Sequence, residues 1–437
     1  MREHPSIIKR YPSYKESGIP WLGEIPEHWV KLRLKNICEI NKDSLREDSN
    51  NLIFDYISIS DINNSGLIIN KERLSFSESP SRARRLVKHR DIIVSTVRTY
   101  LEAIAYIDEC SFLTVASTGF AVLSPIQNII YSKYLFYRVK CQSSIDWIVA
   151  HSLGISYPAI TAFSLGALPI ALPPLTEQRA IADYLDGETA RIDSIVERLT
   201  AQRTRYEQLK RSLISEVITK GLPHHDPATF RSLRLKDTGE ITSAGVDKKI
   251  NPNEQEVYML NYLDVYKSKT YAIDSTDGFM VVTANENQIA DKNVLRGDVF
   301  FTPSSETIED IGVSIVILND LLNTVYSYHI VRFRPFHFMK LLNIEYCKYL
   351  FNNESVQYYM SQNSKGTTRK ILNMNVIENL PIALPTLTEQ KEIVDYLDER
   401  CGRIDRIVEA IGRKIELLEA LRKSIIEEVV TGKRAVS

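Results

Sequence analysis

The sequence predicts a mixed α/β (α+β) protein in which two related domains are joined by two long helices packed as an antiparallel coiled coil. Three observations predict this tandem repeat with approximate twofold symmetry. The chain has 437 residues, more than the roughly 100–200 of a single domain. A proline-rich motif occurs twice at a constant offset, and a heptad pattern of apolar residues follows each copy.

The composition is that of a folded globular protein, with 44% hydrophobic and 25% charged residues. No apolar run approaches the ~20 residues of a membrane span, and the N-terminal sequence MREHPSIIKR lacks the apolar core of a signal peptide. We therefore expect a cytoplasmic protein with no membrane contact. The five cysteines are scattered without a Cys-x-x-Cys pair, as expected of reduced thiols. Because the net charge is −1, a nucleic-acid partner would have to bind local basic patches.

The repeated motif is Leu-Pro-Ile-Ala-Leu-Pro-Pro-Leu-Thr-Glu-Gln at residues 168–178, and it recurs with one substitution at residues 380–390, an offset of 212. The same offset relates two copies of Asp-Tyr-Leu-Asp and two copies of Arg-Ile-Asp, at 183–186 and 395–398 and at 191–193 and 403–405. A constant offset over this length indicates a tandem duplication.

Each copy predicts the start of a helix. An extended apolar and proline-containing stretch leads to Thr176 or Thr388, placed as an N-cap, with glutamate and glutamine in the first turn. The first copy has Gly187 where the second has Glu399. We therefore expect the first helix to kink or break near Asp186.

Beyond this point the apolar residues recur in steps of seven, three and four, as in the seam of a coiled coil. Gln202 and Lys414 are predicted on the seam, either to fix its register or orientation or simply to reach solvent. A helix from Ile192 to Val217 would span about 39 Å, close to one turn of B-DNA at about 34–36 Å. The predicted seam residues are Leu185, Ile192, Ile195, Leu199, Tyr206, Leu209, Leu213 and Val217, with Leu397, Ile404, Ile407, Ile411, Leu418, Leu421, Ile425 and Val429 in the second copy.

The segments before the two copies, residues 1–167 and 222–379, resemble each other only faintly. Residues 90–96 parallel 297–302, Tyr134-Leu-Phe parallels Tyr349-Leu-Phe, and Ser152-Leu-Gly parallels Ser364-Lys-Gly at the offset of 212. Short β-rich runs predict a mixed α/β unit on a small, largely antiparallel sheet in each segment. These runs are residues 54–59, 91–97, 299–302, 313–318 and 325–333.

Basic residues gather at two places, where they are candidates for contact with DNA phosphates or form a charged face exposed to solvent. In the stretch from Ser364 to Lys370, hydroxyl residues and a glycine would let the backbone approach a duplex closely. Arg98 and the loop after residue 303 follow matched strands and are candidates for contact with base edges. The candidates are Arg82, Arg84, Arg85, Lys88, Arg90, Arg98, Ser304, Ser305, Thr307, Lys365, Thr367, Thr368, Arg369 and Lys370.

Sequence signatures of catalysis are absent. There is no Asn/Asp-Pro-Pro-Tyr/Phe motif of an N6-adenine methyltransferase, no phosphate loop and no Gly-x-Gly-x-x-Gly turn. His224 and His225 adjoin each other in a stretch with the composition of a linker, and metal-ligand spacing is absent. We therefore expect no catalytic or metal site.

These features together resemble the specificity subunit of Type I restriction-modification enzymes. The resemblance rests on the doubled motif, the two Arg-Ile-Asp helices, and the helix ends Glu-Val-Ile-Thr-Lys-Gly at 216–221 and Glu-Val-Val-Thr-Gly-Lys at 428–433. Residues 11–29 resemble the N-terminal lead-in of that family, and the second segment lacks a full copy of it. The resemblance covers essentially the whole chain.

The resemblance implies target-recognition domains at residues 1–167 and 222–379 and conserved helical spacers at 168–221 and 380–437. Each recognition domain would bind one half of a bipartite site in double-stranded DNA, and the helices would set the gap between the halves. It also implies two methyltransferase subunits that use S-adenosylmethionine to methylate adenine, and restriction subunits that use ATP and Mg²⁺ for translocation and cleavage. The chain itself would bind no cofactor and catalyse no reaction.

Two other functions remain as alternatives. A coiled-coil adaptor that binds no DNA would explain the helices but not two diverged domains in matched frames. A solitary enzyme, such as a fused methyltransferase-nuclease, is disfavoured by the missing motifs.

Overall fold

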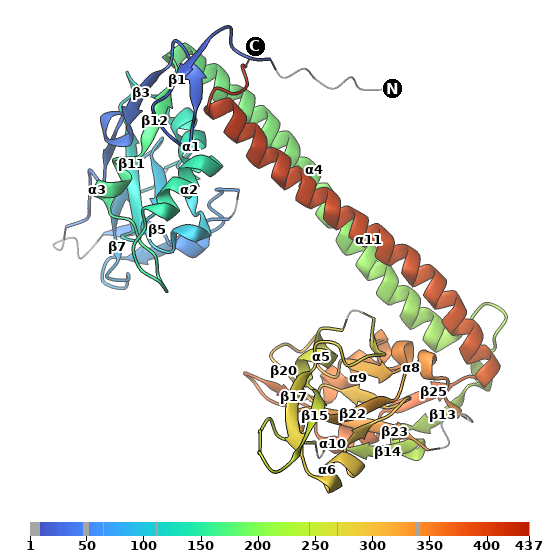
Figure 1. Ribbon diagram of the computed structural model, residues 1–437. Coiled ribbons are helices and arrows are strands. Elements are labelled where there is room, and N and C mark those ends of the chain that lie inside the picture. Colours follow the sequence, from blue (N-terminus) through green and yellow to red (C-terminus); the bar gives the residue numbers. More distant parts are fainter. Residues whose placement is uncertain are drawn as a thin grey trace. The chain divides into compact units, whose positions relative to one another are not determined.

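The computed structural model describes residues 9–46, 52–63, 65–110, 112–243, 245–268, 270–336 and 341–436. The chain forms two compact units, residues 1–199 with 413–437 and residues 200–412. Each unit contains part of both long helices, α4 (Leu175–Lys220) and α11 (Leu387–Val430) (Figure 1). We call the part of unit 1 that precedes α4 the first domain, and the part of unit 2 between α4 and α11 the second domain. None of the described helices combines the length and apolar composition needed to cross a membrane.

Among its described residues, the first domain has two four-stranded sheets, ordered β6-β5-β10-β7 and β4-β11-β8-β9. The pairing is antiparallel except between β5 and β10. These strands are β4 (Cys38–Ile40), β5 (Ile53–Ile57), β6 (Glu72–Ser75), β7 (Ala83–Val87), β8 (Ile92–Ser95), β9 (Ile104–Tyr106), β10 (Thr114–Ser117) and β11 (Phe120–Pro125). Two small ladders pair β1 (Tyr14–Glu16) with β2 (Glu24–Pro26) and β3 (Val30–Arg33) with β12 (Pro169–Leu172), and the helices are α1 (Ser132–Lys140), α2 (Gln142–Ala150) and α3 (Ala162–Leu165).

The second domain repeats this plan in its described part, with sheets ordered β14-β23-β19-β21-β16 and β17-β15-β22-β18. The strands are β14 (Gly239–Thr242), β15 (Gln255–Leu260), β16 (Ala272–Ile273), β17 (Met280–Ala284), β18 (Asn293–Val294), β19 (Val299–Phe301), β21 (Ser314–Ile317), β22 (Leu321–Tyr326) and β23 (Val331–Pro335). Two ladders pair β13 (Arg231–Arg234) with β25 (Pro381–Leu384) and β20 (Ser304–Ser305) with β24 (Lys370–Ile371). The helices are α5 (Tyr262–Tyr266), α6 (Glu286–Asp291), α8 (Ile344–Leu350), α9 (Glu354–Asn363) and α10 (Met374–Glu378).

Four of the five predicted β-rich runs coincide with single strands, namely β5, β8, β19 and β21. The prediction of one strand over residues 325–333 is wrong, because a turn separates β22 from β23. Ser327 Oγ accepts a hydrogen bond from the amide of His329 at 3.3 Å and favours this turn. Each domain also has two sheets rather than the single small sheet that we predicted.

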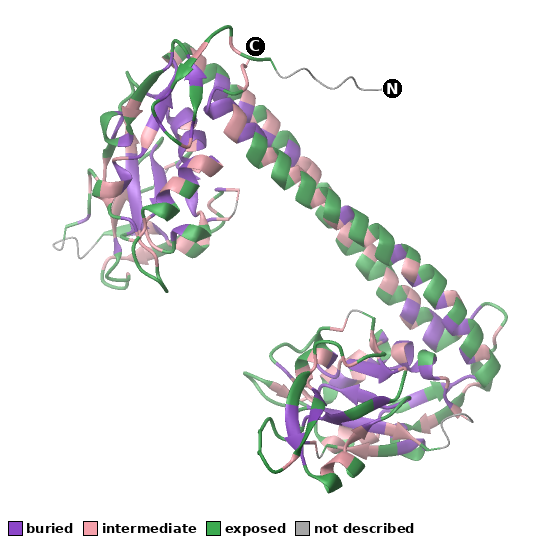
Figure 2. Ribbon diagram, viewed as in Figure 1, coloured by how far each residue is buried: buried purple, intermediate pink, exposed green. Residues whose placement is uncertain are grey.

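The hydrophobic core of each domain extends into the long helices (Figure 2). In unit 1, Leu185 of α4 and Val429 of α11 belong to the same buried cluster as Trp29. In unit 2, Val217 of α4 and Leu397 of α11 belong to one cluster with Phe333. Each domain is therefore fixed to its section of the helix pair by continuous apolar packing.

The repeated motif connects each domain to its helix. Its Pro-Ile-Ala-Leu portion forms β12 in one copy and β25 in the other, and each pairs antiparallel with a strand near the start of its domain. The glutamine that ends the motif is Gln178 or Gln390, and both are fully buried at the first turn of a long helix. A buried amide is stable only when its donors and acceptor find partners.

Gln178 finds three backbone partners. Its Oε1 accepts a hydrogen bond from the Tyr131 amide at 2.7 Å, and its Nε2 donates to Ile129 O at 3.2 Å and Pro173 O at 2.8 Å. Gln390 makes the same three bonds 212 residues later. Its partners are the Asn343 amide at 2.8 Å, Leu341 O at 2.9 Å and Pro385 O at 2.9 Å.

The aspartate that ends each Asp-Tyr-Leu-Asp repeat makes a second matched contact. The Tyr137 hydroxyl of α1 donates to Asp186 at 2.7 Å, and the Tyr349 hydroxyl of α8 donates to Asp398 at 2.5 Å. Burial and these hydrogen bonds raise the pKa of both tyrosines. Tyr349 thus corresponds to Tyr137, and the predicted match with Tyr134 is displaced by three residues, about one helical turn.

The predicted N-caps are wrong by two residues, because the helices begin at Leu175 and Leu387 and place Thr176 and Thr388 in the first turn. In the second copy Thr386 is the cap. Its Oγ1 accepts from the Glu389 amide at 3.3 Å, and Glu389 Oε2 accepts from the Thr386 amide at 2.8 Å, which is a capping box.

The first copy has Pro174 at the cap position, and the N-terminal lead-in takes over the role of the missing threonine. Glu177 accepts hydrogen bonds from the Tyr11 hydroxyl at 2.6 Å and Trp29 Nε1 at 3.0 Å, and it lies 2.7 Å from His28 Nε2. In the second copy, Thr386 supplies the hydrogen bonds to Glu389, so this copy needs no equivalent of the lead-in.

The predicted break at Gly187 is absent, since α4 continues through this residue. No atom lies within 4 Å of the position that a Cβ of residue 187 would occupy. The glycine therefore faces open space, and the buried residues on either side of it, Leu185 and Thr189, stabilise the helix despite the low helix propensity of glycine.

The heptad seam exists, but two of the eight predicted positions in each copy are shifted by one residue. Leu209 and Leu421 are 54% and 48% exposed, whereas the next residues, Lys210 and Arg422, are partly buried. Gln202 and Lys414 are also exposed, and the seam instead contains the residue that follows each of them. In the second copy the seam is Leu397, Cys401, Ile404, Val408, Ile411, Ile415, Leu418, Arg422, Ile425 and Val429, and in the first it is Leu185, Thr189, Ile192, Val196, Leu199, Arg203, Tyr206, Lys210, Leu213 and Val217.

The polar seam residues form matched ion pairs between the helices. In unit 2, Lys210 Nζ lies 2.7 and 2.8 Å from the carboxylate oxygens of Asp405. In unit 1, Arg422 Nε lies 3.3 Å from Asp193 Oδ1. Both cations and both aspartates are separated by 212 residues in the chain, and the aspartates are the last residues of the two Arg-Ile-Asp repeats. These pairs, rather than Gln202 and Lys414, are placed to fix the register of the helices.

We expect the substitution Gln390→Leu to destabilise unit 2 by about 2–4 kcal/mol, because it leaves one buried amide and two buried carbonyls of the backbone without partners. Urea denaturation followed by circular dichroism would measure the loss as a lower transition midpoint. Gln202→Leu is the control, because this exposed glutamine should tolerate the change within about 0.5 kcal/mol. Equal midpoints for the two variants would contradict the role of the buried glutamine.

Candidate nucleic-acid interface

The matched strands β8 and β19 begin at equivalent turns. Asp91 accepts a hydrogen bond from the Lys88 amide at 2.8 Å, and Asp298 accepts one from the Leu295 amide at 2.9 Å. The residue before each aspartate has a positive φ, 74° at Arg90 and 91° at Gly297. Burial raises the pKa of Asp91. The similarity of residues 90–96 and 297–302 therefore reflects a shared turn in which Arg90 and Gly297 have equivalent backbone conformations.

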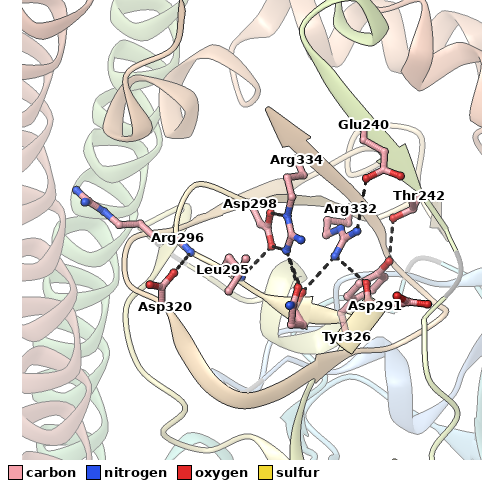
Figure 3. Close-up of polar contacts among 11 residues, drawn as sticks. Glu240, Thr242, Asp291, Leu295, Arg296, Asp298, Asp320, Tyr326, Arg332 and Arg334 are labelled. Carbon is pink, nitrogen blue, oxygen red and sulfur yellow. Dashed lines mark hydrogen bonds and ion pairs between the residues drawn. The ribbon is translucent and has the colours of Figure 1, made fainter. Parts of the chain in front are cut away.

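Asp298 also binds Arg334, one of two arginines of β23 whose polar contacts are drawn in Figure 3. The Arg334 guanidinium makes two hydrogen bonds of 2.6 Å to the Asp298 carboxylate and further bonds to Asn293. Arg332 is 4% exposed and donates to the carbonyls of Asp291 and Asn293, both at 3.2 Å. These two arginines hold the sheets together and are not free for DNA phosphates.

A short hairpin projects from each domain at the Ser-x-Gly echo. Residues 153–159 are closed by reciprocal backbone hydrogen bonds of 2.8 and 2.9 Å between Leu153 and Ala159. Residues 365–371 are closed in the same way, at 2.8 and 3.0 Å, between Lys365 and Ile371. We call these the first and second tip hairpins. Each has a glycine at its second position with nearly the same φ, 107° and 108°.

Each tip hairpin is attached to the segment that follows the matched strand. In the first domain the Arg98 amide donates to Pro158 O and the Ile160 amide donates to Thr96 O, both at 2.8 Å. In the second domain β24 pairs with β20, and the Leu372 amide donates to Pro303 O at 2.8 Å. The structure therefore brings together two sequence segments that we proposed separately as candidates.

The second tip hairpin gathers most candidates of its domain. Arg369 is exposed, and its guanidinium donates to Ser304 Oγ at 2.9 Å, across the junction with β20. The Lys370 ammonium donates to Gly366 O at 2.8 Å within the hairpin. The exposed residues of the hairpin are Lys365, Gly366, Thr367, Thr368, Arg369 and Ile371.

Two candidates of the loop after β19 are less accessible to a duplex. Ser305 is only 4% exposed, and its Oγ accepts a hydrogen bond from the Thr307 amide at 3.3 Å. The exposed Thr307 hydroxyl donates to Asp310 at 2.9 Å. Ser305 therefore acts in the local fold, and the Thr307 hydroxyl can donate a hydrogen bond to DNA only by releasing Asp310.

Arg98 occupies the matching junction of the first domain. It is exposed, with a φ of 51°, and its guanidinium carbon lies 4.8 Å from the centre of the Tyr157 ring in the first tip hairpin. Such a cation–π contact holds a guanidinium in a defined orientation. Each domain thus has one arginine that connects the hairpin to the segment after the matched strand. Arg98 lies in that segment and contacts the hairpin, whereas Arg369 lies in the hairpin and contacts that segment.

The remaining candidates of the first domain lie on or next to β7, which belongs to a different sheet from β8, the strand that precedes Arg98. Arg82 Nε donates to the Tyr56 hydroxyl at 3.2 Å, and the Arg84 guanidinium lies 4.7 Å from the ring centre of Phe76. Arg85 is half-buried, with a contact of 3.5 Å to Ser44. Lys88 forms an ion pair with Asp43 that raises the pKa of the lysine and lowers that of the aspartate. None of these side-chain contacts involves a residue of the first tip hairpin.

Sequence reasoning missed Ile155, Ser156 and Tyr157. They occupy the first tip hairpin where Thr367, Thr368 and Arg369 occupy the second. Candidates for DNA contact were selected by charge and hydroxyl content, and this selection excluded an isoleucine and a tyrosine. Extending the offset of 212 beyond Gly154 and Gly366 would have aligned the two tips and revealed these residues.

His224 and His225 lie together with Glu392, contrary to the interpretation that they are only linker composition. Both Nε2 atoms lie 2.9 Å from Glu392 Oε2. His225 Nδ1 accepts a hydrogen bond from the Leu222 amide at 3.1 Å, so a neutral His225 carries its proton on Nε2 and presents no lone pair there to a metal. The cluster is therefore best explained as a polar contact between the linker and α11.

A family model described as "Type I restriction modification DNA specificity domain" matches residues 26–202 and 227–419. The two matches together cover more than half of the 437 residues. The chain belongs to this family. The resemblance inferred from the doubled motif is thereby confirmed.

Individual relatives agree with this assignment. A candidate Type I restriction enzyme MjaX specificity subunit of Methanocaldococcus jannaschii is 24% identical over 96% of this chain and 97% of its own. The Type I restriction enzyme EcoBI specificity subunit of Escherichia coli is 23% identical, covering 70% of this chain and 67% of its own. A solved chain from a study of complex assembly and conformational transition of the type I R-M system has a TM-score of 0.73 at 22% identity, covering 93% of this chain and 98% of its own. The last similarity supports the fold.

We expect Gly366→Ala to disorder the second tip hairpin without unfolding the domain. A Cβ at residue 366 would lie 2.1 Å from Arg369 O, in a backbone conformation that is strained for alanine. Hydrogen exchange of the Ile371 amide, which closes the hairpin, should accelerate at least about tenfold as the local opening equilibrium shifts. Gly278→Ala is the control, because that glycine also has a positive φ but no atom within 4 Å of a Cβ. Unchanged protection of Ile371 would show that the hairpin tolerates a Cβ at this position.

Proposed function

We propose that the chain is the DNA-binding specificity subunit of a Type I restriction-modification complex and that each domain recognises one half of a bipartite site. One observation carries this proposal. The two domains attach equivalent hairpins to equivalent strand ends through the same backbone hydrogen bonds, yet most exposed side chains of the hairpins differ in chemistry, with the hydroxyl pair Ser156 and Thr368 as the exception. Recognition of two different half-sites by two related domains requires different exposed side chains on the same backbone structure.

The candidate residues divide between two roles in this proposal. Arg82, Arg84, Arg85 and Lys88 in the first domain, and Lys365 and Lys370 in the second, would contact phosphates and give affinity without sequence preference. Arg98, Ser304, Thr307, Thr367, Thr368 and Arg369 would contact base edges, with the two arginines placed for bidentate contact to guanine. Ser305, which is buried, would support the junction.

The helices would set the gap between the half-sites and bind the partner subunits. The ion pairs of Lys210 with Asp405 and of Arg422 with Asp193 favour one register of α4 against α11. We propose two methyltransferase subunits as partners, with S-adenosylmethionine as their cofactor, and restriction subunits that use ATP and Mg²⁺. This chain would contribute positioning and no catalytic step, in the cytoplasm where the DNA lies.

The alternative of a coiled-coil adaptor that binds no DNA is less well supported. An adaptor would use the helices and their ion pairs equally well. It gives no reason for two exposed hairpins that share backbone geometry but not side chains.

The methylation pattern of a host genome tests the proposal. The chain would be expressed with its neighbouring methyltransferase gene in a host that lacks DNA methylation, and N6-methyladenine would be mapped by long-read sequencing. We expect methylation at a split motif with a fixed unspecified gap. Methylation without a split motif, or none from a complex shown to assemble, would favour the adaptor.

A deletion of one heptad in both helices tests the role of the spacers. Removing residues 200–206 and 412–418 shortens each helix by about 10.5 Å, or about three base pairs at roughly 3.4 Å each. The two interhelical ion pairs remain in register after this double deletion. We expect the same two half-site sequences with a gap about three base pairs shorter, again measured as a methylation motif. A gap of unchanged length would exclude the helices as the determinant of spacing.

A further inference from the structure

The first tip hairpin is unusually apolar for an exposed element. Ile155 is fully exposed, Leu153 is 79% exposed and Tyr157 is 65% exposed. Isolated surface hydrophobic residues are common, but three of them in one short hairpin form a cluster that usually marks a binding site. The corresponding residues of the second tip hairpin are Lys365, Thr367 and Arg369, all polar.

The equivalence of the two hairpins indicates which ligand the apolar cluster of the first hairpin contacts. Both hairpins have the same closing hydrogen bonds, the same glycine conformation and the same attachment to a strand end. The second carries the guanidinium, hydroxyl and ammonium groups that DNA-binding proteins use. Because the frames match, the side of the hairpin that faces the ligand in one domain faces it in the other.

Among the base edges of the major groove, one group is apolar. Thymine carries a 5-methyl group, and proteins recognise it with apolar side chains. Ile155 lies at the tip with its side chain exposed, and Arg98 contacts the same hairpin, with its guanidinium held over the Tyr157 ring at 4.8 Å. An apolar tip beside an oriented guanidinium matches a thymine next to a guanine.

We propose that the first tip hairpin reads its half-site from the major groove, with Ile155 against the 5-methyl group of a thymine and Arg98 paired with a neighbouring guanine. Tyr157 is a positioning residue that orients Arg98. The second tip hairpin reads its half-site by hydrogen bonds from Thr367, Thr368 and Arg369. This inference rests on the proposed function, since it assigns chemistry to the DNA-binding surface of each domain.

Binding-site selection with the purified full-length chain tests the inference. The chain would be used to enrich duplexes from a randomised pool, and the enriched pool would be sequenced for the wild type, Ile155→Ala and the control Ile69→Ala. Ile69 lies in the same domain and is 65% exposed, so the control also removes exposed apolar surface, but outside the hairpin. Both substitutions are on the surface and should leave the melting temperature unchanged.

We expect Ile155→Ala to weaken the preference for thymine about fourfold at one position of one half-site, the effect of losing contact with one methyl group. The other half-site and the salt dependence of binding should not change, because no charge is altered. Replacing that thymine by uracil, which removes only the 5-methyl group, should weaken binding of the wild type about fourfold and leave binding of Ile155→Ala unchanged.

Two results would overturn the inference, and they have different meanings. If the wild type selects a split site and Ile155→Ala selects it with the same preferences, or binds all sequences uniformly more weakly, Ile155 does not read thymine and the proposed function stands. If the wild type selects no split site at all, the proposed function fails and this inference fails with it.

Discussion

The structure depends on the buried side-chain amides of Gln178 and Gln390. Each amide connects the loop before a domain helix, the end of a motif strand and the first turn of a long helix through three hydrogen bonds to the backbone. No other side chain of similar size offers both an acceptor and two donors in this geometry. A domain can therefore dock on its helix in only one way, and that way is the same in both halves of the chain.

This arrangement separates the part of each domain that must stay constant from the part that can vary. The constant part consists of buried groups and backbone hydrogen bonds, such as the contact of Asp91 or Asp298 with the turn before its strand. The variable part consists of exposed side chains on hairpins whose backbone is closed by its own hydrogen bonds. A substitution at Ile155 or Thr367 alters chemistry at the surface without disturbing the core, so recognition can diverge while the fold remains.

The doubled motif was sufficient to predict the tandem fold, the two long helices and the family, because a repeat with a constant offset constrains all three at once. The predictions for individual residues were wrong where a single property, apolarity or charge, was used to select them. Apolarity alone placed Leu209 and Leu421 on the seam, but Lys210 and Arg422 lie there because their alkyl chains pack while their charged ends reach aspartates. Charge alone selected the basic residues around β7 and did not select the first tip hairpin, which corresponds to the second tip hairpin in backbone geometry and at the sequence offset of 212.

The interhelical ion pairs explain how a seam that is polar in places can still specify one register. Pairs with this degree of exposure contribute little to stability, typically below about 1 kcal/mol. Their effect is to disfavour other registers of α4 against α11. Sliding the helices by one heptad in either direction keeps most apolar seam residues in contact but brings Asp193 toward Ile415 or Val429, neither of which can neutralise a carboxylate. The two ion pairs, Asp193 with Arg422 in unit 1 and Lys210 with Asp405 in unit 2, thus lower the free energy of the native register relative to the shifted ones. This free-energy difference keeps the register fixed, as it must be if the helices are to set a spacing along DNA.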